Sequence, residues 1–172
     1  MTRHDGFTLI ETIIALCLLL VVATGVLPLG LIAMNSTENQ GHLLARTVEY
    51  AQDKLEQLMV LSYGDTTTDT RVFPAADAGG SGLAIGGSAN PDAPVALYVD
   101  YLDAAGTLVP SAGVAAPNGW YYKRVWSVTN PQPANPTLKQ ITVTVTVRSG
   151  AAAGNGGAIP RATVAVLKTS PF

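Results

Sequence analysis

Residues 6–34 read GFTLIETIIALCLLLVVATGVLPLGLIAM, and this stretch decides the fold. No charged residue occurs from Thr12 to Thr37. The 22 residues from Ile13 to Met34 are almost wholly apolar, and as a helix they would span roughly 33 Å. That length covers the hydrocarbon core of a bilayer, and apolar side chains on every side are typical of a helix surrounded by lipid.

Glu11 stands at the start of this apolar run without a basic neighbour. A charged side chain deep in a bilayer costs about 2.5–3.5 kcal/mol on insertion scales, so such residues usually have a partner. The first Lys or Arg after Glu11 in the sequence is Arg46. Three interpretations remain open: Glu11 pairs with another molecule, it lies near the membrane interface, or it is protonated.

The small residue that marks a possible cleavage site, Gly6, precedes the apolar run, whereas a secretory signal carries it afterwards. The sequence begins with a short polar leader that ends in Gly6. The aromatic Phe7 follows, and Glu11 is the fifth residue after Gly6. This pattern resembles the processing motif of type IV prepilins and pseudopilins. The resemblance implies that residues 1–6 are a leader peptide, cut between Gly6 and Phe7 by prepilin peptidase. It also implies that the amine of Phe7 is methylated and that Glu11 pairs with the amine of a neighbouring subunit.

Three residues predict a kink in the membrane segment 7–34. Pro28 cannot donate a backbone N–H and its ring clashes with the preceding turn, and Gly25 and Gly30 flank it. The alternative is that Pro and Gly are simply frequent in membrane helices. The resemblance to pilins favours a helix that loosens here when the subunit enters a filament.

Residues 35–64 are predicted to form an amphipathic helix that continues the first one, from near Phe7 to Tyr63, with Gly64 as a stop signal. Apolar residues recur at spacings of four, three, four and three, and the charged residues fall mostly off this stripe. The stripe consists of Leu44, Val48, Ala51, Leu55 and Leu58, and the charged set of Arg46, Glu49, Asp53, Lys54 and Glu56.

Residues 65–94 are rich in turn-forming residues and predict a connecting loop with a short strand near Arg71–Phe73. Residues 95–172 predict an antiparallel sheet, because β-branched, aromatic or alternating segments recur there. The predicted strands are Val95–Leu102, Trp120–Val128, Lys139–Arg148 and Ala162–Lys168, with a hairpin loop at Ser149–Pro160. The expected fold is therefore α+β and pilin-like, a long N-terminal helix packed on a four-stranded antiparallel sheet.

Several functions find no support in the composition. A net charge of −2 without a basic tract argues against nucleic acid as a partner. No catalytic set or cofactor motif can be drawn, so we expect neither an enzyme nor a cofactor. The lone cysteine, Cys17, cannot close a disulfide within the chain. Four aspartates could bind calcium, although roles in turns are favoured for them. They are Asp65, Asp69, Asp100 and Asp103.

We call the predicted sheet of residues 95–172 the head. The order of elements resembles that of PilV-type minor pilins and of the minor pseudopilins of type II secretion, and the head lacks paired cysteines. The predicted function is a minor structural subunit of a type IV pilus or related filament. Its partners would be prepilin peptidase, other pilin subunits, an inner-membrane assembly platform and, before assembly, membrane lipid. The predicted location is the bacterial inner membrane, with a cytoplasmic N-terminus, and then a periplasmic or surface filament. Alternatives are a pseudopilin of a secretion or DNA-uptake machine and a membrane-anchored periplasmic binding module.

Overall fold

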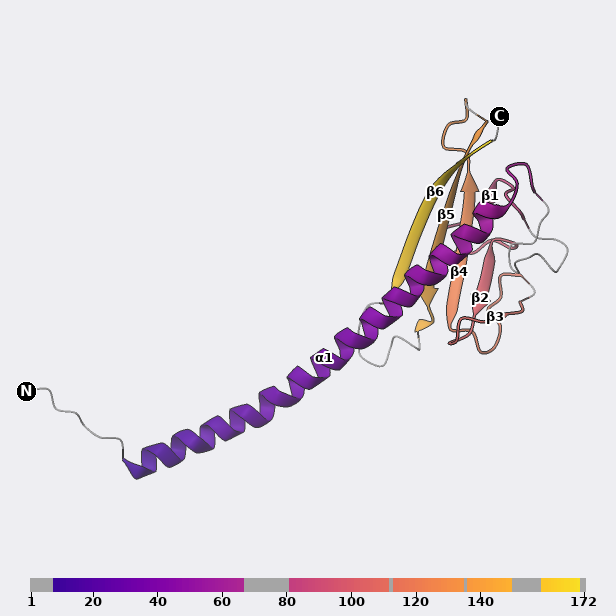
Figure 1. Cartoon of the computed structure of the whole chain (residues 1–172). Coiled ribbons are helices and arrows are strands. Elements are labelled where there is room, and N and C mark those ends of the chain that lie inside the picture. The colour runs from indigo at the N-terminus through magenta and orange to yellow at the C-terminus, as the bar shows by residue number, and fades with distance from the viewer. Residues whose placement is uncertain (1–7, 67–80, 112, 135, 150–158, 171–172) are drawn as a thin grey trace, which may run out of the picture. The chain divides into compact units, whose positions relative to one another are not determined.

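The computed structural model describes residues 8–66, 81–111, 113–134, 136–149 and 159–170. The chain divides into two compact units, Met1–Asn39 and Gln40–Phe172, which are described separately below. One long helix, α1 (Leu9–Val60), precedes a series of strands (Figure 1). The strands are β1 (Gly86–Gly87), β2 (Val99–Leu102), β3 (Leu108–Val109), β4 (Tyr122–Thr129), β5 (Leu138–Val147) and β6 (Arg161–Thr169).

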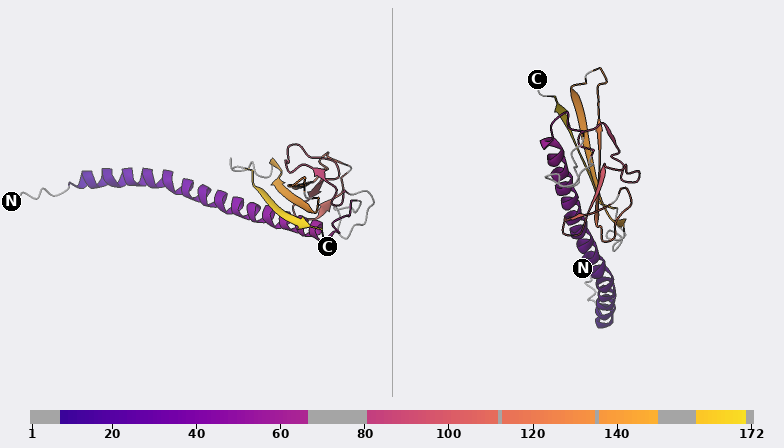
Figure 2. Two further views of the ribbon diagram at one scale, coloured as in Figure 1. Left: turned by 90° about the horizontal axis from the view of Figure 1, so that it is seen from above. Right: turned by 90° about the vertical axis from the view of Figure 1, so that its right-hand side faces the viewer.

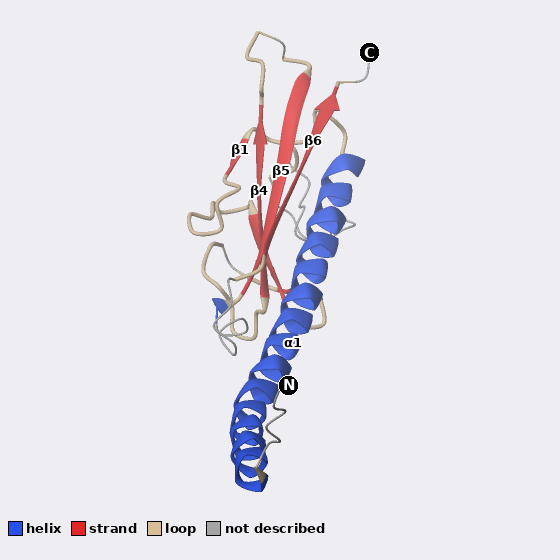
Figure 3. Cartoon of the chain, turned by 90° about the vertical axis from the view of Figure 1, so that its left-hand side faces the viewer, coloured by secondary structure: helices blue, strands red, loops and turns tan. Residues whose placement is uncertain are grey.

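All strand pairs in the sheet are antiparallel, and the order is β3-β2-β4-β5-β6, with β1 also paired to β4. Strands β2 and β1 share one edge of β4, since Val99 lies opposite Val125 and Gly86 opposite Val128. The long strands β4, β5 and β6 lie side by side (Figure 3). The predicted α+β class with an antiparallel sheet is confirmed, although the sheet has six strands rather than four.

The α1 segment from Gln40 onward lies along one face of the sheet (Figure 2). Ala51 and Leu58 of this segment are fully buried in one core cluster with Trp126 of β4 and Val143 of β5. Alternate residues of β4 and β5 face the helix because side chains alternate across a strand. This contact between helix and sheet is the main core of the unit.

The predicted apolar stripe of the helix is displaced from the buried one. Leu44 and Val48 were expected to be inside, but 46% and 36% of their surfaces are exposed. Lys54 was expected off the stripe, but it and Thr47 are fully buried. The reason for the burial of Lys54 is an ionic partner on the sheet, Asp100, which hydrophobic periodicity does not register.

Strand β2 begins at Val99, later than the predicted start at Val95. Leu97 has a φ of 70°, a left-handed conformation that a strand excludes, and its carbonyl accepts a hydrogen bond from the Ser81 hydroxyl. The amide of Tyr98 donates to the carbonyl of Val95, which closes a turn where a strand was expected.

The additional strands β1 and β3 have two residues each and carry little sequence signal. Gly86 and Gly87 belong to a glycine-rich tract for which the sequence predicts flexibility, yet they pair with β4. A side chain at Gly87 would clash with the carbonyl of Trp126 and the ring of Tyr98. Only glycine therefore permits this close approach.

One strand lysine binds carbonyls at the end of α1, and a second binds the chain that follows it. The helix ends at Val60, slightly before the predicted Tyr63, and its own last turn has no basic residue. Lys168 of β6 donates to the carbonyls of Met59 and Leu61. Lys139 of β5, opposite Lys168 in the sheet, donates to the carbonyls of Tyr63 and Leu83 at 2.8 Å. The sheet thus supplies the cations that a helix C-terminus favours.

Some predicted features lie outside the described residues. They are the strand near Arg71–Phe73, residues 67–80 of the connecting loop and residues 150–158 of the predicted hairpin loop. These features stay predictions.

Replacing Lys168 by Met should weaken the attachment of the helix end to the sheet. The variant leaves two carbonyls without their charged donor, so we expect a loss of about 1–3 kcal/mol in the free energy of unfolding. Denaturant unfolding of the full chain in detergent, followed by tryptophan fluorescence, measures it. Arg46→Met is a suitable control, because its surface ion pair with Glu49 should contribute at most about 1 kcal/mol. Equal midpoints for the two variants would contradict a capping role.

Candidate functional site

The first unit contains one candidate membrane span, Leu9–Leu31, with 23 residues and a mean hydropathy of 2.6. None of the span is buried, and large apolar side chains such as Leu9, Leu19 and Leu29 are each more than two-thirds exposed. At 1.5 Å per residue the span is about 35 Å long, sufficient for a bilayer core. An exposed apolar surface of this extent requires lipid or protein around it.

Glu11 lies in the first turn of α1, within the span. Its amide donates to the carbonyl of Thr8 at 3.1 Å, and the hydroxyl of Thr12 donates to the carbonyl of Leu9 at 2.8 Å. The Glu11 side chain is exposed, and no ion pair to it occurs within the described part of the chain. The positive end of the helix dipole favours a carboxylate here but does not replace a counter-charge.

A local role for Glu11 has some support in the sequence. Thr8 and Glu11 have the spacing of a capping box, in which both side chains bond to backbone amides at a helix start. The structure shows the amide of Glu11 bound to the backbone carbonyl of Thr8. Within the described residues the reciprocal side-chain bonds of a capping box do not occur, so a cap does not account for this carboxylate.

The other predicted site residues have different outcomes. Gly6 and Phe7, the predicted cleavage site, lie outside the described residues, so cleavage there stays a prediction.

Helix α1 runs unbroken through Gly25, Pro28 and Gly30, so the loosening predicted for filament assembly also stays a prediction. Since Pro28 has no N–H, the carbonyl of Thr24 lacks its usual helical donor, which marks this turn as the weakest of the span.

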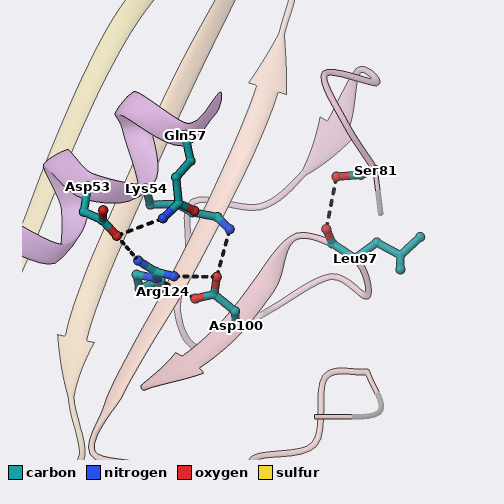
Figure 4. A network of polar contacts seen from close by, with 7 residues as sticks. All are labelled: Asp53, Lys54, Gln57, Ser81, Leu97, Asp100 and Arg124. Carbon is teal, nitrogen blue, oxygen red and sulfur yellow. Dashed lines mark hydrogen bonds and ion pairs between the residues drawn. The ribbon is translucent and has the colours of Figure 1, made fainter. Parts of the chain in front are cut away.

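In the second unit, four charged side chains join the helix to the sheet (Figure 4). Arg124 of β4 binds both oxygens of Asp100 on β2, with Nε 2.7 Å from Oδ1 and Nη2 2.9 Å from Oδ2. Lys54 of α1 approaches Asp100 Oδ2 to 2.9 Å. Arg124 Nη1 also binds Asp53 Oδ2 of α1 at 2.8 Å.

This network has no net charge, because two cations face two carboxylates. The side chains of Lys54, Asp100 and Arg124 are at most 3% exposed, whereas that of Asp53 is 54% exposed. The Lys54 ammonium also lies 4.2 Å from the centre of the Trp126 ring, a cation–π contact. The arrangement fixes which helix turn lies over which strand, since any shift would leave buried charges unpaired.

The pKa values follow from burial and from these partners. Burial alone would raise the pKa of Asp100, but the charges of Arg124 and Lys54 outweigh it and hold the pKa below its ordinary value. Burial would lower the pKa of Arg124, yet Asp100 and Asp53 raise it overall. Asp100 and Arg124 therefore stay ionised at neutral pH.

Two of the four carboxylates considered for calcium have other roles in the structure. Asp100 belongs to the buried network, and Asp103 accepts hydrogen bonds at 2.8 Å from the amides of Ala105 and Thr107 in the β2–β3 turn. Asp69 lies outside the described residues. In the part of the chain that is described, no group of three potential ligands could hold a metal ion.

Comparison with known protein families identifies the N-terminal segment. The family model for the prokaryotic N-terminal methylation motif matches residues 1–27. The chain carries this methylation motif. The motif, followed by an apolar helix, supports a type IV pilin-like or pseudopilin protein that is processed by prepilin peptidase and assembles with other pilin subunits. It is also consistent with membrane anchoring. No curated protein and no solved structure matches the chain significantly.

Asp100→Asn tests the network in the second unit. The variant leaves Lys54 and Arg124 buried without their shared carboxylate, so we expect a loss of about 3–5 kcal/mol in the free energy of unfolding at pH 7. Asp92→Asn, at a side chain 78% exposed, should change it by less than about 0.5 kcal/mol. Denaturant unfolding of the full chain in detergent gives both values.

The same variant predicts a pH dependence. The pKa of Asp100 is lower in the native state than in the unfolded chain, where it is about 3.9. The stabilisation is therefore complete above this unfolded value and disappears as the pH falls through the native pKa. Wild type should lose stability relative to Asp100→Asn as the pH falls below about 4. Parallel pH profiles would show that Asp100 contributes no such linkage.

Proposed function

We propose that the mature chain is a minor structural subunit of a type IV pilus or a related filament, rather than an enzyme. It waits in the inner membrane with a cytoplasmic N-terminus, and an inner-membrane assembly platform moves it into the filament. The observation that carries the proposal is Glu11, an exposed carboxylate without a described partner at the start of an apolar span that follows a methylation motif.

Charge balance supports assembly through Glu11. Cleavage between Gly6 and Phe7 would create a cationic amine next to the span, and the sequence holds no Lys or Arg between Phe7 and Arg46. In an apolar filament core, each of these two charges left alone would cost several kcal/mol. Pairing the carboxylate of one subunit with the amine of the next removes both costs and sets the axial register between subunits.

The exposed apolar span supports the same proposal. Lipid covers such a surface in the membrane, and neighbouring helices can cover it in a filament without a large change in apolar environment. The weak turn at Pro28 gives the helix a place to adjust on transfer. A subunit built in this way is stable in both surroundings.

The head supports a minor rather than a major subunit. Its single cysteine, Cys17, lies in the span, so no disulfide holds the head. Stability instead comes from the helix–sheet core, and the buried network around Asp100 fixes how the helix aligns on the sheet. Such a head can present a distinct surface on the filament.

Replacing Glu11 by Val tests the proposal. We expect normal removal of residues 1–6, seen by mass spectrometry as a methylated Phe7 N-terminus. We also expect incorporation into filaments to fall by roughly tenfold or more, because the neighbour's amine loses its counter-charge. Recovery of the chain in sheared filaments, relative to its processed level in membranes, measures this effect.

Two variants complete the test. Glu11→Gln keeps the shape of the side chain and should assemble as poorly as Glu11→Val, which separates charge from packing. Glu38→Val removes an exposed carboxylate beyond the span and should assemble normally. A wild-type level of Glu11→Val in filaments would refute assembly through Glu11, absence of the wild-type chain from filaments would favour a membrane-anchored module, and an intact Met1 would refute processing.

A further inference from the structure

A row of polar side chains crosses the sheet on the face opposite α1. Lys123 of β4 lies opposite Thr146 of β5, which in turn lies opposite Arg161 of β6. Their neighbours along each strand, such as Tyr122 and Val147, belong to the helix-facing core. Because side chains alternate, Lys123, Thr146 and Arg161 share the outer face.

A pocket of about 470 Å³ opens above this row. The row forms its floor, and Asp92, from the loop before β2, contributes to its wall together with Trp120, Val147, Ser149 and Ile159. The Lys123 ammonium holds this loop down by donating to the carbonyl of Pro91 at 2.7 Å. A volume of this size, with mixed apolar and polar walls, suits a small ligand.

The pocket is positively charged in a chain whose net charge is −2. Lys123 and Arg161 face it with one carboxylate, Asp92, which is 78% exposed and 3.4 Å from the Arg161 guanidinium. Both cations keep N–H donors beyond these contacts, and the hydroxyls of Thr146 and Ser149 add polar groups. Together these groups fit an anion with several acceptor oxygens.

One wall of the pocket is aromatic and fixed in place. The Trp120 ring packs edge-on against Tyr101, with ring centres 5.7 Å apart, and Tyr101 is 1% exposed. Ile159, 48% exposed, adds apolar surface. The Lys123 ammonium and the Arg148 guanidinium also lie over the Trp120 ring, each 5.8 Å from its centre, so a ligand ring would contact the part of Trp120 that lines the pocket.

We propose that this pocket binds a small ring-shaped molecule that carries a carboxylate, such as an acidic sugar. The carboxylate binds Arg161 and Lys123, and the ring lies against Trp120. Guanidinium groups bind carboxylates through two parallel hydrogen bonds, so we expect Arg161 to contribute most of the affinity.

Electrostatics agree with this geometry. Burial lowers the pKa of Lys123, Asp92 opposes the shift, and the positive charge of Arg161 adds to the lowering. The two cations therefore repel each other across the row. A bound carboxylate would relieve this repulsion, which a neutral ligand cannot do.

Titration of the full chain in detergent with D-glucuronate tests the proposal, with D-glucose as the neutral ring of matched shape. Tryptophan fluorescence is the readout, because Trp120 lines the pocket. We expect saturable binding of glucuronate and affinity at least roughly tenfold weaker for glucose. Arg161→Gln should weaken glucuronate binding by a similar factor, while Arg161→Lys should retain part of it.

Arg46→Gln provides the matched control, because its side chain is 45% exposed, close to the 48% of Arg161, and it does not line the pocket. It should bind glucuronate as wild type does. Circular dichroism checks that each variant is folded. The proposal fails if glucuronate does not bind, if glucose binds equally well, or if Arg161→Gln binds as tightly as Arg46→Gln.

Discussion

The carboxylate of Glu11 is the constraint on which this account depends. It lies in the first turn of a 23-residue apolar span whose surface is wholly exposed. Ionised in an apolar environment, it requires a cation within a few ångströms, and the described residues do not supply one. The methylation motif at residues 1–27 marks the chain for a cleavage that creates such a cation at the N-terminus. These two facts support the proposed structural subunit, because neighbouring chains can satisfy each other's charges.

The second unit also contains charges that water does not reach, and it pairs them within one chain. The side chains of Lys54, Asp100 and Arg124 are buried, and each has an ionic partner among the others. A buried network of this kind gives little net stability but penalises every other alignment strongly. Together with Lys168, which binds the helix end, it fixes the register of the helix from Gln40 onward on its sheet. The head can therefore keep one arrangement without a disulfide.

Local patterns predicted much of the fold, and contacts between distant residues account for what they missed. The sequence predicts the apolar run, the alternation in β5 and the α+β class, because each depends on a short stretch of residues. It does not predict the burial of Lys54, because this burial depends on Asp100, a partner on a different element. The turn at Leu97 and the Gly86–Gly87 strand likewise arise from contacts with Ser81 and Trp126. The pocket over Lys123 and Arg161 was missed because three strands in register bring its charges together.

The most direct test of the central claim is treatment of assembled filaments with an apolar carbodiimide, which joins a carboxylate to an amine in contact with it. The account predicts a covalent link from Glu11 to the N-terminal amine of another subunit, and hence a product with the mass of two chains. A link from Glu11 to Phe7 of its own chain, or an unlinked adduct typical of a protonated carboxyl group, would contradict the account if the filaments were otherwise normal.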